Sequence, residues 1–220
     1  MHPTFMRPDP WIEILFSIII VASCLIIFFR TKELYELTLH KGIKYFRFAF
    51  LFFAFGFIMK LLFPVIKVFD YEPFAFRGYF GFIMMFTGTM ALLCLLYSVI
   101  WKRIKSEKND FYFLITLSLA FSIMTSLARI RFYVMLFQIL VLLSIIIISY
   151  SNFRKEDRKS LHASLYVLYG MISVAWLANT AANFMSRISI TTSITLNIIS
   201  GALFIIALYK VIKKTRATRK

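Results

Sequence analysis

Residues 111–150 read FYFLITLSLAFSIMTSLARIRFYVMLFQILVLLSIIIISY, and this stretch decides how many times the chain crosses a membrane. It holds two apolar runs, 111–127 and 132–150, which are separated only by the tetrapeptide ARIR at 128–131. A single long span would place two arginines in the middle of the lipid, where a charged side chain is costly. The stretch therefore predicts two helices that are joined by a tight turn at the membrane surface.

The composition of the whole chain indicates a lipid bilayer. Of its 220 residues, 60% are hydrophobic and only 16% are charged, and the mean hydropathy is +0.79. A water-soluble domain of this length needs more polar surface to cover its core. Because roughly 20 residues cross a hydrocarbon core of about 30 Å, we expect an all-α, multi-pass protein of a prokaryotic cell membrane, a single domain over residues 1–220. Its seven expected spans cover about residues 11–29, 45–66, 79–101, 111–127, 132–150, 161–184 and 190–211.

The basic residues predict the orientation of the spans, because positively charged loops stay on the cytoplasmic side. Most of the 26 Lys and Arg fall in the loops after spans one, three and five and in the C-terminal tail. The N-terminus is then outside the cell and the C-terminus is cytoplasmic. This topology accounts for the net charge of +16 without a nucleic-acid site. We expect the basic loops to contact anionic lipid headgroups instead.

The side chains that most often carry catalysis or bind metals are scarce in the predicted spans. Glu13 is the one acid within a span and lies in its first turn, while Cys24 and Cys94 stand singly in apolar runs. No nucleophile and base occur at matching depth, and no cluster has the spacing of a zinc or haem site. Lys210 lies at the cytoplasmic end of span seven, which excludes the mid-membrane Schiff base of a retinal protein. The sequence thus predicts no enzyme, no metal, no cofactor and no catalytic residue.

Neutral polar residues gather in the last two spans and mark a candidate ligand site. Asn179 and Asn183 lie one turn apart on span six, and Ser193 and Asn197 form a stripe on span seven that begins at the same outer surface. Facing each other, these side chains would line a polar cleft that is open to the outside. Lys60, two turns inside the outer end of span two, would meet an anionic or hydroxyl-rich ligand there. The alternative is that the Asn and Ser side chains join helices, with hydrogen bonds of roughly 0.6 kcal/mol each.

Phenylalanine is concentrated in the second span. The seven phenylalanines between residues 46 and 57 lie all round a helix. This distribution predicts contacts with lipid and with the bundle core, and no single binding face. A β-strand is excluded, because an open sheet edge cannot exist in lipid.

A faint internal repeat relates the two halves of the chain. The end of span three, LYSVIWK at 96–102, is similar to the end of span seven, LYKVIKK at 208–214. Two parallel three-helix repeats joined by a fourth helix would have the 3+1+3 plan of the SWEET and PQ-loop sugar transporters. Helix ends that face the cytoplasm also look alike in unrelated proteins, because Tyr, Lys and Arg anchor there. The Pro-Gln pair of those transporters is missing from this chain, so both interpretations stay open.

The segment RTKELYELTLHKGIKYFRFAFLFFAFGF at 30–57 covers the first predicted cytoplasmic loop and the start of the second helix. It resembles a recurring segment of uncharacterised seven-helix integral membrane proteins of archaea, and the membrane halves of some prokaryotic sensors. The resemblance implies a membrane fold and no particular activity.

Three functional hypotheses remain. The leading one is a non-enzymatic membrane protein of the sensor or partner-binding kind, with the cleft between spans six and seven as its outward-facing site. Its basic loops would bind a cytoplasmic or membrane protein partner. The alternative is a facilitator or transporter of a small neutral or anionic solute, and the third option is a structural subunit of a membrane complex.

Overall fold

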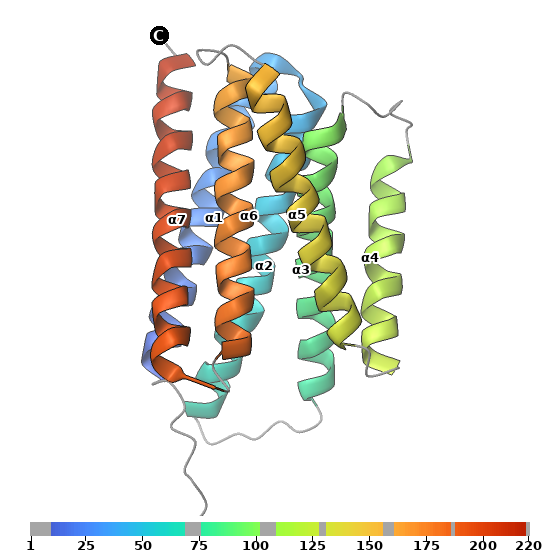
Figure 1. Cartoon of the computed structure of the whole chain (residues 1–220), viewed down its shortest axis with the longest axis vertical. Helices are drawn as coiled ribbons and strands as arrows, with labels where there is room; N and C mark the ends of the chain where they lie inside the picture. Colours follow the sequence, from blue (N-terminus) through green and yellow to red (C-terminus); the bar gives the residue numbers. More distant parts are fainter. Residues whose placement is uncertain are drawn as a thin grey trace, which may run out of the picture.

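The computed structural model of the protein describes residues 10–68, 76–101, 109–127, 131–155, 161–185 and 188–218, and these form seven α-helices. The helices lie side by side and alternate in direction along the chain (Figure 1). Six of them are long and apolar enough to cross a membrane, and α4, with 18 residues, is the shortest. The predicted all-α, multi-pass membrane fold is confirmed. The helices are α1 Pro10–Thr38, α2 Lys41–Val68, α3 Phe76–Ile100, α4 Asp110–Leu127, α5 Arg131–Lys155, α6 Leu161–Met185 and α7 Ile190–Thr218.

The segment after the first span differs from the expected loop. α1 continues to Thr38 and α2 begins at Lys41, so only Leu39 and His40 lie between the two helices. Leu39 is in the left-handed region with φ of 49°, and its amide donates to the Tyr35 carbonyl at 2.7 Å. This is a common way to end a helix, although glycine is the usual residue there. The end of α1 is too polar for lipid but stays helical, because its Lys, Glu and Leu residues have high helix propensity.

Six of the helices form a closed ring, and α4 lies outside it. Around the ring the main contacts follow the order α1, α2, α3, α5, α6 and α7, and α7 closes on α1. α4 packs mainly against α3 at the edge of the bundle (Figure 1). The contacts among α1, α2 and α3 are therefore repeated among α5, α6 and α7.

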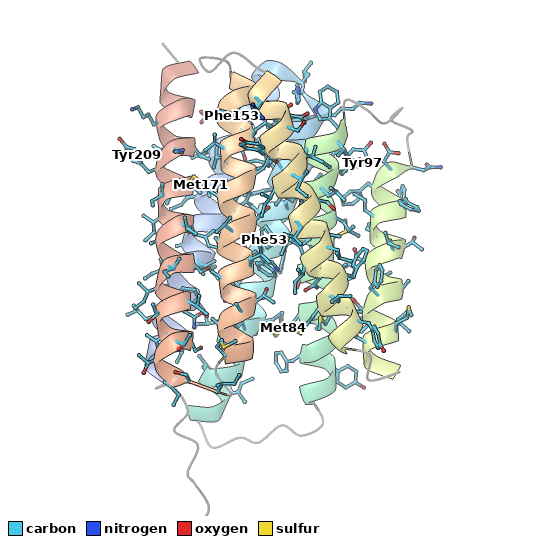
Figure 2. All side chains as sticks on the ribbon, in the orientation of Figure 1. Phe53, Met84, Tyr97, Phe153, Met171 and Tyr209 are labelled. Atoms are coloured by element: carbon cyan, nitrogen blue, oxygen red, sulfur yellow. The ribbon has the colours of Figure 1, made fainter. Side chains whose placement is uncertain are left out.

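The interior of the ring is largely aromatic, and Figure 2 shows Phe53 near the middle of the bundle. Four phenylalanines of α2, spaced three or four residues apart, share one fully buried face. Phe48 instead packs against Phe111 of α4, with ring centroids 5.1 Å apart, and Phe55 is exposed. The phenylalanines of this span thus lie all round α2, as expected, and four of them form its face toward the core. They are Phe46, Phe50, Phe53 and Phe57.

Ser98 joins three helices at the end of the bundle where α2 begins. Its hydroxyl donates to the Gly42 carbonyl of α2 at 2.5 Å and lies 2.6 Å from the Tyr169 hydroxyl of α6. Nearby, the Tyr97 hydroxyl donates to the Asp110 carboxylate and ties α3 to α4. Because unpaired polar groups are costly in an apolar interior, these hydrogen bonds favour one mutual placement of the four helices.

Replacing Gly42 by alanine tests the close approach of α2 and α3. A Cβ at Gly42 would lie 2.8 Å from the Trp101 side chain and 3.0 Å from the Ser98 carbonyl oxygen. We expect Gly42→Ala to lower the free energy of unfolding by about 1–3 kcal/mol, the usual cost of overpacking, measured by thermal unfolding in detergent micelles. Gly170→Ala in α6 is the control, because nothing lies within 4 Å of a Cβ there. Equal melting temperatures for the two variants would contradict the tight contact.

Candidate functional site

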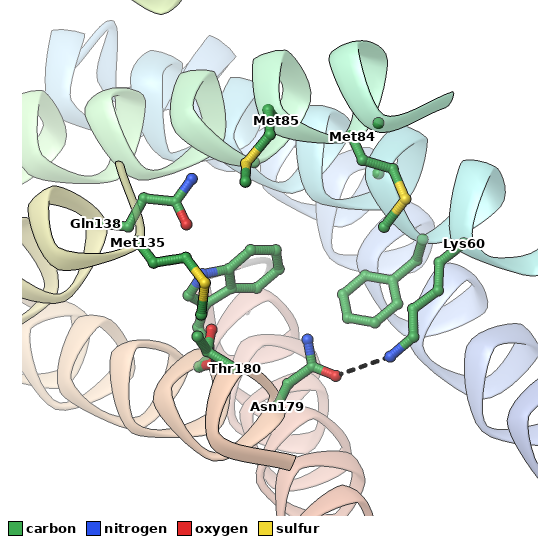
Figure 3. A pocket seen from close by; sticks show the side chains of 12 residues that line it. Lys60, Met84, Met85, Met135, Gln138, Asn179 and Thr180 are labelled. Carbon is green, nitrogen blue, oxygen red and sulfur yellow. Dashed lines mark hydrogen bonds between the residues drawn. The ribbon is translucent and has the colours of Figure 1, made fainter. Parts of the chain in front are cut away.

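A cavity of about 260 Å³ lies inside the ring, between α2, α3, α5 and α6. It is close to the end of the bundle where α2 and α6 end and where α3 and α5 begin. Its wall combines polar side chains with methionines and three glycines (Figure 3). The lining residues with polar side-chain groups are Lys60, Gln138, Trp176, Asn179 and Thr180.

Lys60 and Asn179 meet at one edge of the cavity. The Lys60 Nζ donates to the Asn179 Oδ1 at 3.2 Å and so connects α2 to α6 (Figure 3). The Nζ also lies 5.8 Å from the ring centroids of Phe16 and of Phe57, within the range of cation–π attraction. Asn179 is buried. The edge of the cavity therefore holds a positive charge next to a buried amide and two aromatic faces.

The wall of the cavity away from Asn179 is apolar and adaptable. Met84 and Met85 of α3 and Met135 of α5 line it (Figure 3). Methionine is unbranched and flexible, so it can follow the shape of a bound molecule. Gly88 also lines the cavity, and a Cβ there would lie 3.5 Å from the Trp176 ring. A larger side chain at Gly88 would therefore fill part of the space.

Trp176 belongs to the deepest layer of the cavity. Its ring centroid lies 4.7 Å from that of Phe53 and 5.9 Å from that of Phe57. Farther from the cavity, Phe46 packs against Tyr169 with centroids 5.2 Å apart. The Trp176 Nε1 is buried and has no hydrogen-bond partner. Aromatic side chains thus fill the ring between the cavity and the opposite end of the bundle.

Gln138 supplies a polar group in the same deep layer. Its Nε2 donates to the Thr89 Oγ1 at 3.1 Å and joins α5 to α3. Our sequence analysis did not single out this residue, although a lone amide in an apolar span is a signal for a contact between helices. The lining methionines and glycines carry no such signal, because the same residues are common in bundle cores.

The stripe of polar residues on α7 packs against α6. The Ser193 hydroxyl donates to the Ala182 carbonyl at 2.9 Å, and the Ser200 hydroxyl donates to the Ala175 carbonyl at 2.8 Å. Both serines are buried. At these positions the expected cleft between spans six and seven is therefore a closed interface, because the hydroxyls satisfy backbone carbonyls of the neighbouring helix. The cavity lies between α6 and the helices α2, α3 and α5 instead.

The structure brings together two of the candidate site residues, Lys60 and Asn179. Asn197 lies between the two interface serines along α7, and its Oδ1 is buried without a hydrogen-bond partner. Asn197 is not among the residues that line the cavity. The side chain of Asn183 lies outside the part of the chain that the structure describes.

The groups around the cavity can bind a ligand by hydrogen bonds and by apolar contacts. Lys60 and Asn179 offer N–H donors, and the methionines and Phe57 offer apolar surface. Among the side chains that the structure describes, no group of three His, Cys, Asp or Glu could hold a metal ion.

Comparison with known proteins identifies a distant relative. The chain is 26% identical, over an alignment of 227 residues, to an uncharacterized protein of Archaeoglobus fulgidus, and the alignment covers 97% of this chain and 98% of the other. The similarity to an archaeal protein thus extends well beyond residues 30–57, where the sequence analysis noted it. No protein-family model matches the chain, and no solved structure matches it significantly.

Removing the two serine hydroxyls tests the interface between α6 and α7. We expect the double variant Ser193→Ala, Ser200→Ala to lose roughly 1 kcal/mol of unfolding free energy, because hydrogen bonds between membrane helices average about 0.6 kcal/mol each. Thermal unfolding in detergent micelles measures the loss. Ser144→Ala is the control, since its exposed hydroxyl donates to the Leu140 carbonyl of its own helix. If the double variant melts like the control, the hydroxyls do not hold the interface.

Proposed function

We propose that the protein is a non-enzymatic receptor of the cell membrane that binds a small molecule in the cavity between α2, α3, α5 and α6. The observation that carries this proposal is the one-sided position of the cavity. Lys60 and Asn179 lie near one end of the bundle, and Trp176 packs on Phe53 to fill the ring beyond them. Within the described part of the bundle, the aromatic side chains beyond Trp176 block the way of a ligand that enters from that end, which suits sensing better than transport.

The lining of the cavity favours binding over catalysis. Of the described residues, those that line it include no Ser, Cys, His, Asp or Glu. These are the side chains that most often act as nucleophiles or as general acids and bases. Lys60 contributes an ammonium that already donates to Asn179, and such a group can anchor a ligand without reacting with it.

Trp176 can pass the effect of binding to the rest of the bundle. It packs against Phe53 of α2 and lies next to Gly88 of α3, so it joins α6 to two other helices of the ring. A ligand that displaces Trp176 shifts these helices against one another. At the opposite end of the bundle, exposed Lys41 and Lys44 present positive charge to anionic lipid or to an acidic partner protein.

A facilitator or transporter of a small solute is the second candidate, and the arrangement of the ring favours it. The contacts among α5, α6 and α7 repeat those among α1, α2 and α3, and α4 connects the two sets. The SWEET transporters are likewise built from parallel repeats. In such a protein the aromatic layer at Trp176 and Phe53 would open during each transport cycle.

Cysteine labelling separates the receptor from the transporter. In a protein with Cys24→Ala and Cys94→Ala, single cysteines are placed by Thr180→Cys, which lines the cavity, and by Ser173→Cys, seven residues earlier on the same side of α6. A charged, membrane-impermeant thiol reagent is then added to each side of the membrane in turn. We expect Thr180→Cys to be labelled from one side only. Ser173→Cys should be labelled from neither, because Ser173 is fully buried.

Two results would contradict the receptor. Labelling of Ser173→Cys from the side opposite to that of Thr180→Cys would show that the aromatic layer opens, as transport requires. A complete lack of labelling at Thr180→Cys, from either side, would show that the cavity does not admit water-soluble molecules.

A further inference from the structure

We propose that the ligand of the cavity is a small amphipathic anion, with an oxyanion head at Lys60 and Asn179 and an apolar body against Met84, Met85 and Met135. This inference rests on the proposed function, because it names the class of molecule that the same cavity binds. The chemistry of the lining supports this ligand class, because Lys60 places a positive charge at one edge of the cavity and methionine thioethers cover the wall.

The head of the ligand is assigned from the donors at the edge of the cavity. The Lys60 ammonium places a positive charge there and donates to the Asn179 Oδ1. Because the Oδ1 accepts from Lys60, the Asn179 Nδ2 points away from the lysine, toward the middle of the cavity (Figure 3). A carboxylate or phosphate can accept from both groups in charge-assisted hydrogen bonds, which are stronger than neutral ones.

The body of the ligand is assigned from the remaining wall. The three methionines, together with Phe57, present apolar surface that follows the shape of a bound molecule. The cavity volume of about 260 Å³ is below the roughly 300–1,000 Å³ of sites for drug-sized ligands. A short aliphatic chain or a single ring is therefore the size of body that the site accepts.

Two other ligand classes fit the lining less well. A cation would be repelled by Lys60, and the described residues of the lining contain no carboxylate to attract it. A polyol needs a hydrogen-bond partner for each buried hydroxyl. The methionine sulfurs are weak acceptors, so the apolar wall leaves such hydroxyls unsatisfied.

Quenching of Trp176 fluorescence tests whether the cavity selects anions. The chain has three tryptophans, so Trp11→Phe and Trp101→Phe leave Trp176 as the single fluorophore. The quenchers are iodide, caesium and neutral acrylamide, with the protein in vesicles of zwitterionic lipid. Lys60→Gln removes the charge but keeps an amide donor for Asn179. Arg47→Gln is the matched control, because Arg47 lies over Phe28, toward the other end of α2.

We expect acrylamide to quench Trp176 equally in the parent protein and in both variants, which shows that the cavity is intact. Iodide should quench the parent more strongly than caesium does. Lys60→Gln should lower the iodide quenching constant by a factor of roughly 3–10, the effect of one partly screened charge at short range. Arg47→Gln should leave that constant unchanged.

The outcomes distinguish failure of the ligand class from failure of the receptor. If acrylamide reaches Trp176 but iodide quenching does not depend on Lys60, the cavity is open and the anion assignment is overturned. If acrylamide does not reach Trp176 in the parent protein, the cavity is closed and both proposals are overturned.

A pair of matched probes tests the head and the body together. Hexanoate and hexanamide have the same chain and differ in charge. We expect hexanoate to protect Trp176 from acrylamide at a roughly tenfold lower concentration than hexanamide, the effect of about 1.4 kcal/mol from the charged hydrogen bonds. Lys60→Gln should abolish this difference. Equal potency of the two probes in the parent protein would overturn the assignment of the head.

Both a soluble amphipathic anion and an anionic lipid have an oxyanion head and an apolar body. The lipid composition of the vesicles distinguishes between these two ligands. The hexanoate measurement is repeated in vesicles that contain phosphatidylglycerol. Protection that persists there supports a soluble ligand. Protection that disappears only there supports a lipid that already occupies the cavity, and both results agree with the proposed class.

Discussion

The packing of Trp176 is the interaction on which the arrangement of the ring depends. The indole lies between α6 and α2, where Phe53 and Phe57 contact it, and it faces Gly88 of α3, where a Cβ would lie 3.5 Å from the ring. One large ring on α6 therefore sets the spacing of three helices at a single level. It also separates an aromatic core on one side from a cavity on the other. The packing of Trp176 against Phe53 and Phe57 therefore both closes the ring beyond the cavity and forms the deep wall of the cavity.

Hydrogen bonds then determine which helix faces meet. Many hydroxyls in the bundle donate to a carbonyl of their own helix, as Ser122 does to Ser118, and such a hydrogen bond does not join helices. Ser98, Ser200 and Gln138 donate to other helices instead. Because a polar group without a partner is costly in an apolar interior, each crossing hydrogen bond selects one pairing of helix faces. The closed interface between α6 and α7 is one result. The cavity lies on the other side of α6, where this helix faces α2, α3 and α5.

The position of α4 outside the ring bears on the choice between a receptor and a transporter. With α4 outside the ring, the remaining six helices form two sets of three with the same internal contacts. In transporters that are built from repeats, one set of helices moves against the other. The aromatic filling of the ring, from Trp176 to Tyr169, opposes such motion and favours a receptor.

The sequence by itself determined that the protein is helical and crosses the membrane, and it placed the apolar part of each helix along the chain, although not the continuation of α1 to Thr38. Length and apolarity suffice for this, because lipid admits only segments whose backbone hydrogen bonds are internal. It also marked Lys60 and Asn179 as unusual residues for a membrane. It placed them in one candidate ligand site, but it did not predict their direct hydrogen bond, nor that Gln138, Gly88 and the methionines line the cavity beside them. Only the tertiary structure decided this, because the rotation of each helix depends on packing and hydrogen bonds between segments far apart in the chain.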